Sequence, residues 1–188
     1  MKTIKSILVA VAVILATGVN AKSLTADASS SKIKWHGAKV SGEHWGYINL
    51  KSGSLSVESG KISTGEFVVD MTTITCEDLQ GEWSDKLVGH LNSDDFFSTA
   101  KHETSTLKVT EATPFKGGKA KVKADLTIKD ITKPVEFEAT QDGNKYTAEI
   151  KVERTLYDIK YGSGKFFSDL GDKMIDDHFT LTINLVVK

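Results

Sequence analysis

The chain has 188 residues, and its 24 basic residues nearly balance its 25 acidic residues, which gives a formal net charge of −1. A chain with so little net charge has no general electrostatic attraction to nucleic acid, so we expect no nucleic-acid partner. The single cysteine, Cys76, cannot form an internal disulfide, and the fold therefore has to rest on its apolar core.

Residues 1–21 have the composition of a secretory signal peptide. Lys2 and Lys5 precede an apolar run over residues 7–16, and Ala21 ends a cleavage site of small residues. The apolar run is too short to span a bilayer, which takes about 20 residues, so we expect no stable membrane insertion. We predict cleavage after Ala21, an exported protein that is periplasmic or secreted, and a single domain over residues 22–188.

Most of the remaining chain alternates apolar and polar residues with a period of two. This pattern is typical of β-strands that bury one face, and it is clearest over residues 67–71, 120–128 and 135–139. We expect the apolar faces to point into a shared interior. The side chains predicted to line an apolar, ligand-binding cavity there are Trp35, Phe67, Val69, Met71, Leu126, Ile128, Phe137 and Leu181.

Short turn sequences separate the alternating runs: Gly117-Gly118, Lys129-Asp130 and Asp142-Gly143-Asn144. Turns of this length join antiparallel neighbours. About eight strands without evident edge protection are most stable in a sheet that closes on itself, because closure removes the exposed edges. The sequence therefore predicts an all-β fold, an antiparallel eight-stranded barrel with one short helix.

The helix is predicted from the one segment that breaks the alternation. Apolar residues recur at every fourth position from Leu79 to Leu91, which is the spacing of one helix face. Thr75 is a candidate N-cap, with Asp78 three residues later as its capping-box partner. We expect this helix to lie across a mouth or a flank of the barrel.

Four elements of the sequence are found together in one known family. They are Lys39-Val40 with Gly42, His44 and Gly46, followed by residues 65–71; residues 90–97 with Ala100-Lys101-His102; residues 125–135; and Arg154 with Tyr157 and Ile159. On these residues, the chain from about Ser31 to Lys188 resembles the YceI-like family of exported, lipocalin-like lipid-binding proteins.

The resemblance implies a lipocalin-like barrel with a long apolar cavity and a ligand such as a polyisoprenoid, a quinone or a similar long-chain lipid. It also implies that His44, Arg154 and Tyr157, at recurring positions, are candidate partners for the polar head of the ligand. The donors of Arg154 suit a phosphate or carboxylate; the alternative is a structural salt bridge at the barrel end. We predict that the protein carries or sequesters one such amphiphile, and we leave a homodimer open.

Two other functions remain open from the sequence: an exported enzyme acting on a hydrophobic substrate, and a structural barrel with a filled core. The five histidines show no spacing typical of a metal site. No Gly-x-Ser-x-Gly element marks an activated nucleophile. We therefore predict no catalytic residue, no metal ion and no cofactor.

Overall fold

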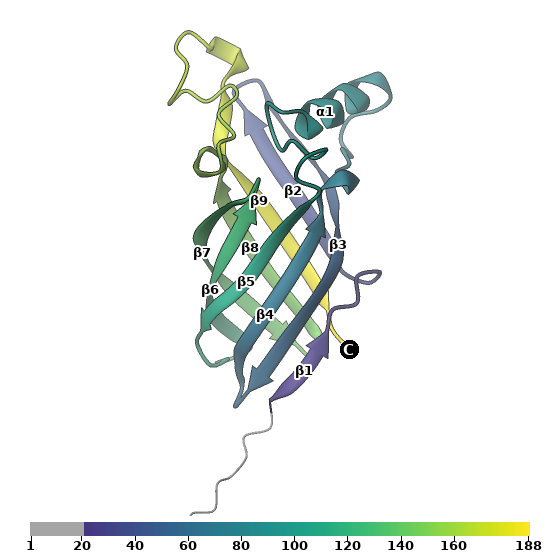
Figure 1. The fold of residues 1–188 in the computed structure, drawn as a ribbon, viewed down its shortest axis with the longest axis vertical. Helices are drawn as coiled ribbons and strands as arrows, with labels where there is room; N and C mark the ends of the chain where they lie inside the picture. The colour runs from purple at the N-terminus through teal and green to yellow at the C-terminus, as the bar shows by residue number, and fades with distance from the viewer. Residues whose placement is uncertain (1–20) are drawn as a thin grey trace, which may run out of the picture.

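The computed structural model describes residues 21–188 (Figure 1), so the predicted signal peptide of residues 1–21 lies, apart from Ala21, outside the described residues. Within residues 21–188 no helix is long and apolar enough to cross a membrane. The elements in this part of the chain are β1 (Lys22–Thr25), β2 (Lys32–Lys39), β3 (Gly42–Glu58), β4 (Lys61–Asp70), η1 (Met71–Thr73), α1 (Glu82–Asn92), β5 (Thr104–Ala112), β6 (Lys119–Ile128), β7 (Ile131–Asp142), β8 (Lys145–Glu153), η2 (Arg154–Tyr157), η3 (Gly171–Lys173) and β9 (Ile175–Val186).

The strands form one closed antiparallel barrel. Their order in the sheet is β1-β3-β2-β9-β8-β7-β6-β5-β4, and β3 also pairs with β4, which closes the cylinder. Strand β1 pairs with the second half of β3, while β2 pairs with its first half, so β1 and β2 share one position in the wall. The predicted antiparallel eight-stranded barrel with one helix is thereby confirmed.

The two ends of the barrel differ. We call the end that carries α1 the upper end, as it lies in Figure 1; it is made by the connections 39–42, 70–104, 128–131 and 153–175. The lower end carries only short connections and lies near β1 and the C-terminus. The long connections of the chain therefore gather around one mouth of the barrel.

The predicted turns join consecutive strands at the expected places. Lys116 pairs with Lys119 across Gly117-Gly118, and Asp142 pairs with Lys145 across the next lower turn. At the upper end, Lys129 and Asp130 adopt positive φ angles of 50° and 60° between β6 and β7. Such left-handed pairs match the twist of a two-residue hairpin.

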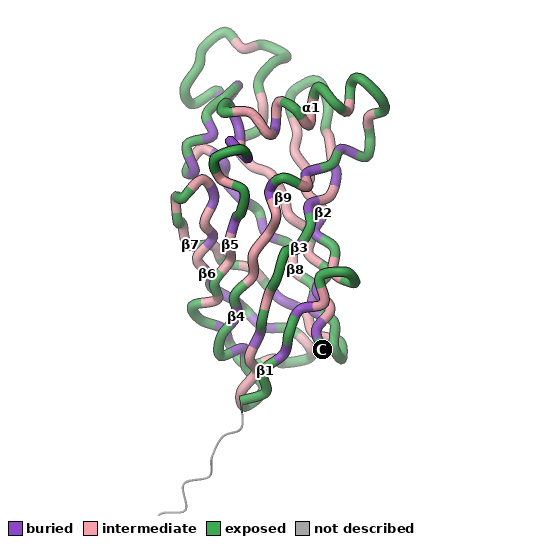
Figure 2. The backbone as a smooth tube through the Cα atoms, turned by 45° about the vertical axis from the view of Figure 1, so that its right-hand side comes forward, coloured by how far each residue is buried: buried purple, intermediate pink, exposed green. Residues whose placement is uncertain are grey.

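More buried and more exposed residues alternate along several strands, as the colours of the backbone in Figure 2 indicate. In β6, for example, Val122, Ala124 and Leu126 are buried, while Lys121 and Lys123 between them are exposed. Successive side chains of a strand point to opposite faces. A period-two sequence therefore places one apolar face toward a common interior.

The helix begins later than the sequence predicts. Helix α1 starts at Glu82 with Gly81 at its N-cap position, so neither Thr75 nor Asp78 caps it. The predicted helix is therefore confirmed over its second part, and its start is corrected. The side chains of Thr75 and Asp78 instead accept hydrogen bonds from backbone N–H groups at the neighbouring edge of β3.

The segment around Thr75 covers the upper edge of β3, beyond the point where β4 ends. The Tyr47 N–H donates to Thr75 Oγ1 at 3.1 Å, and the Trp45 N–H donates to Asp78 Oδ1 at 2.9 Å. The Thr75 carbonyl approaches β3 so closely that a Cβ at Gly46 would lie 1.9 Å from its oxygen. Only glycine at position 46 lets the segment pass here.

Candidate functional site

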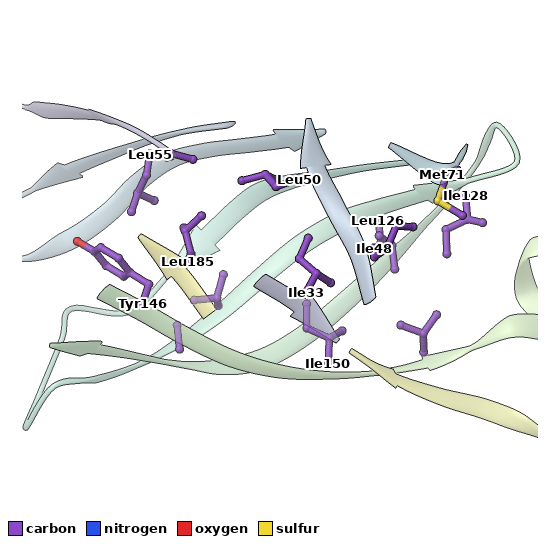
Figure 3. Close-up of a cluster of buried hydrophobic side chains, with 14 of the residues drawn as sticks. Ile33, Ile48, Leu50, Leu55, Met71, Leu126, Ile128, Tyr146, Ile150 and Leu185 are labelled. Atoms are coloured by element: carbon purple, nitrogen blue, oxygen red, sulfur yellow. The ribbon is translucent and has the colours of Figure 1, made fainter. Parts of the chain in front are cut away.

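The barrel encloses an elongated apolar cavity of about 210 Å³. Its wall runs along the barrel: Figure 3 shows buried side chains from Tyr146 and Leu55 at one end to Met71 and Ile128 at the other. All eight side chains predicted to line the interior do so: Trp35, Phe67, Val69, Met71, Leu126, Ile128, Phe137 and Leu181. The interior therefore keeps space that a filled core would lack.

Buried side chains lie at both ends of the cavity. At the lower end Leu55 and Tyr146 are at most 5% exposed, and at the upper end Met71 and Ile128 are at most 6% exposed. The Tyr146 hydroxyl accepts a hydrogen bond from Gln141 Nε2 at 2.9 Å, so its polar atom has a partner. The cavity is therefore an interior space of the barrel that buried side chains bound at both ends.

Two glycines keep the Phe67 ring against the wall. Gly53 is the cross-strand partner of Phe67, and a Cβ at Gly53 would lie 2.5 Å from Phe67 Cδ1. Gly65, two residues before Phe67, likewise leaves room for the ring, since a Cβ there would lie 3.3 Å from Phe67 Cε2. The ring can thus contact the backbone of its own wall, which leaves space at the centre of the barrel.

The wall is also interrupted in its upper half, between β7 and β8. The pairing of these strands stops at Ala139 and Ala148, although β7 continues to pair with β6 and β8 with β9. Pro134, which has no N–H to donate, lies in the part of β7 that has no partner on the β8 side, as expected for a strand edge. The barrel wall is therefore less continuously hydrogen-bonded in its upper half.

Arg154, a candidate partner for a ligand head, reaches the cavity wall with only 2% of its surface exposed. Its guanidinium donates to the carbonyls of Asp176 and Ile159, each at 2.8 Å, and of Ile175 at 3.0 Å. Burial lowers the pKa of Arg154, whereas Asp177, 3.6 Å from Nη2, raises it. Because the nitrogens of Arg154 already donate to backbone carbonyls, the geometry favours a structural role for this residue over contact with a ligand head.

The other two head-group candidates are not on the cavity wall. His44, in β3, has its Nδ1 atom 2.7 Å from Oδ2 of Asp78, and Asp78 belongs to the segment that covers the edge of β3. Tyr157 is 1% exposed, and burial raises the pKa of its hydroxyl to about 12. Tyr157 lines a separate hollow at the seam between β7 and β8, together with Pro134. The fold therefore brings only Arg154 of the three to the cavity.

Asp78 gives the protein a predicted sensitivity to acid. Burial raises its pKa, but hydrogen bonds from the Trp45 N–H, His44 and Cys76 outweigh this effect, and the pKa lies below its ordinary value of 3.8. A depressed carboxyl pKa stabilises the fold above the unfolded-state value, and this contribution is lost as the pH falls through the folded-state value.

We therefore expect Asp78→Asn to lower the free energy of unfolding at pH 7 by about 1–3 kcal/mol, because it weakens charge-assisted hydrogen bonds. The loss in stability between pH 5 and pH 2 should then be smaller in Asp78→Asn than in the wild type. Urea unfolding at several pH values measures both quantities. Equal slopes for the two proteins would show that Asp78 does not contribute in this way.

The predicted set of cavity-lining residues leaves out several wall residues, among them Ile33, Leu55, Leu91, Phe96, Phe97, Ile150 and Phe179. Those in strands follow the same alternation and could have been included. Leu91 ends the apolar face of the predicted helix, but its direction toward the barrel depends on where α1 packs. Phe96 and Phe97 follow α1 in a turn, where no period indicates which side chain points inward.

Two serines on the wall donate to the backbone. Ser105 Oγ donates to the Thr127 carbonyl and Ser31 Oγ to the Asp27 carbonyl, each at 2.7 Å. Within residues 21–188 there is no group of three or more side chains that could hold a metal ion. The mainly apolar wall can thus accept apolar surface of a ligand.

An antiparallel barrel around an apolar cavity defines a class, the lipocalin-like barrels with an interior suited to a hydrophobic ligand. Residues 24–187 match the family model of the YceI-like domain, and the chain belongs to that family. A curated relative from Vibrio cholerae, a UPF0312 protein, is 32% identical over 102 residues, which are 51% of this chain and 52% of the relative. The match thus spans about half the length of that relative.

Solved structures share the fold at low sequence identity. Burkholderia cenocepacia BcnA has a TM-score of 0.68 at 17% identity, covering 87% of this chain and 99% of that one. A polyisoprenoid-binding domain from Saccharophagus degradans, implicated in plant cell wall breakdown, has a TM-score of 0.57 at 13% identity, covering 88% and 97%. At these identities the similarity establishes the fold.

Proposed function

We propose that this protein binds one long-chain amphiphile and carries or sequesters it outside the cytoplasm, in the periplasm or in the medium. The tail lies in the barrel cavity and the polar head stays at the upper end. The observation that carries this proposal is the elongated cavity inside the barrel, which is lined mainly by apolar side chains. A polyisoprenoid, a quinone or a similar lipid fits this description.

The small volume of the cavity favours a ligand with a slender tail. A volume of about 210 Å³ is below the roughly 300–1,000 Å³ of common ligand pockets. A linear chain can use such a narrow space, whereas a bulky ring system needs the wall to move. Partly buried aromatic side chains on the wall, among them Phe97, Phe137 and Phe179, would have to shift to admit one.

Burial of the tail is the main driving force for binding. A tail that loses about 300 Å² of accessible apolar surface gains about 7 kcal/mol at roughly 25 cal/mol per Å². A micromolar dissociation constant corresponds to about 8 kcal/mol, and ordering the ligand reduces the gain from burial. Micromolar affinity therefore requires a tail that loses more than about 300 Å² of apolar surface. The head must stay hydrated, because an unpaired polar group in the dry interior costs several kcal/mol.

Binding is also favoured over catalysis by the polar groups of the described residues. The side-chain hydrogen bonds of His36 and His44 go to carboxylates, and the serines on the wall donate to backbone carbonyls. An activated nucleophile requires a hydroxyl or thiol next to a base. The S. degradans neighbour, named for polyisoprenoid binding, supports a lipid-like ligand class.

The test has two parts. Mass spectrometry of organic extracts of the purified protein should identify a co-purifying lipid with a long apolar tail. Titration of delipidated protein with a prenyl diphosphate, a quinone and a fatty acid should give at least one dissociation constant of about 1 μM or lower. If none of the three binds and no lipid is extracted, the carrier function is wrong.

A further inference from the structure

The large apolar side chains that are exposed within residues 21–188 all lie at the upper end of the barrel. Trp83 on α1 is 70% exposed, and Phe166 and Phe167, in the connection between η2 and η3, are 49% and 50% exposed. The full set is Val40, Trp83, Leu156, Tyr161, Phe166, Phe167 and Met174. We call these seven residues the apolar rim.

The segments that carry the apolar rim are connected to one another. The ring of Tyr161 packs on His90 of α1, with the ring centroids 4.5 Å apart. The Val40 N–H, in the hairpin between β2 and β3, donates to the Met174 carbonyl at 3.0 Å. The segments that carry the rim are therefore held to one another at the upper end, and the rim side chains project from them.

A protein partner would have to match a divided surface. In Figure 1, helix α1 and the connection after η2 stand as two separate projections on either side of the upper end. Stable protein interfaces need about 800 Å² of well-packed surface on each partner. A bilayer is fluid and can receive apolar side chains from two projections without a matching shape, so the geometry favours a lipid surface.

The composition of the rim also fits a lipid surface. Tryptophan, tyrosine and phenylalanine with nearby lysines are typical of residues at the bilayer interface. Lys86 Nζ lies 5.0 Å from the centre of the Trp83 ring, and Lys160 Nζ lies 5.3 Å from that of Phe166. Each ring thus has a cation beside it that can remain among the head groups while the ring enters the apolar layer.

The net charge of the upper end indicates which force would drive the association. Residues 39–43, 79–95 and 154–176 together contain six basic and nine acidic residues. This excess of acidic residues gives no attraction to an anionic membrane. Association would therefore depend on burial of the apolar rim, and it should be weakly sensitive to salt.

We propose that the upper end docks reversibly on a lipid bilayer, with Trp83, Phe166 and Phe167 inserted at the interface. This inference rests on the proposed function, since a carried amphiphile has to be exchanged with a membrane. The cavity-lining residues Leu91, Phe96 and Arg154 lie in the same upper-end connections as the apolar rim. Docking would thus hold this end of the cavity close to the lipids, so that a tail crosses little water on its way.

The experiment measures partition of the protein, lacking residues 1–21, onto phosphatidylcholine vesicles by co-sedimentation. Phe166→Ser/Phe167→Ser should weaken the partition by more than about 10-fold. Lys116→Ser/Lys145→Ser, which changes exposed residues at lower turns, is the matched control and should not. Raising the salt to about 0.5 M should change wild-type partition by less than about two-fold.

Trp83 provides a second, local readout. Its fluorescence should shift to shorter wavelength when vesicles are added, and the shift should decrease in Trp83→Phe while the partition is largely retained. Absence of wild-type partition would overturn the inference, and so would partition that the control variant loses as strongly as the phenylalanine variant. A wild type that is dimeric without vesicles, and monomeric in the phenylalanine variant, would identify the rim as a protein interface instead.

The outcome is separable from that of the proposed function. Titration with a soluble amphiphile in the absence of vesicles measures the cavity alone. Ligand binding without vesicle partition would refute docking and leave the carrier function intact. Vesicle partition without ligand binding would refute the carrier function and leave the inference of membrane docking intact.

Discussion

Replacing Arg154 with methionine is expected to destabilise the fold by about 3–5 kcal/mol, which is the cost of breaking a buried charge pair from one side. The substitution would leave the carbonyls of Ile159, Ile175 and Asp176 without these donors. It would also remove one of the two cations beside Asp177, leaving Lys165 as the other. Urea or thermal unfolding measures this loss directly.

The matched control is Lys160→Met, on the connection that follows Arg154. Lys160 pairs with Asp158 at the surface, and such exposed pairs contribute about 0–1 kcal/mol. Arg154→Lys should fall between the two variants, because lysine keeps the charge but lacks the planar fork of donors. If Arg154→Met unfolds like the wild type but binds the ligand much more weakly, Arg154 is a head-group residue rather than a structural one.

Replacing Ala148 with tryptophan is expected to weaken ligand binding by more than about 100-fold, since an indole in the barrel occupies the space that a tail needs. Ala148 lines the cavity from β8, beside the point where its pairing with β7 stops. Overpacking costs about 1–3 kcal/mol of stability, so the circular dichroism of the variant should confirm that it is folded.

Glu149→Trp is the control for this substitution. Glu149 is the next residue of β8, is exposed, and points to the opposite face of the strand. The control adds the same side chain to the outer surface and should bind ligand as the wild type does. Unchanged binding by a folded Ala148→Trp protein would place the ligand outside the barrel.

The local sequence pattern alone determined much of this protein. Alternation in β6 and β7 places Leu126, Ile128 and Phe137 on the inner wall, because the direction of a strand side chain depends only on its position along the strand. The turn at Lys129-Asp130 was likewise recognisable, since a two-residue connection between alternating runs leaves few alternatives to a hairpin. Strand directions and the antiparallel order followed from these turns.

Tertiary structure decided the features that depend on partners distant in sequence. Thr75 and Asp78 have the spacing of a helix start, yet the free edge of β3 uses their oxygens, so α1 begins at Glu82. A charged side chain such as Arg154 resembles a ligand-binding group in sequence. Its backbone partners become adjacent only when β9 returns beside β8, 21 and 22 residues later in the chain.

The cavity and the apolar rim also belong to the tertiary structure. Whether a barrel is hollow depends on whether its inner side chains reach the centre or lie against the wall, as Phe67 does beside Gly53 and Gly65. An exposed phenylalanine such as Phe166 has the same sequence signature as a buried one. Its exposure follows from the long connections that gather at the upper end. Sequence thus determined the wall of the barrel, and long-range packing decided what the wall leaves open.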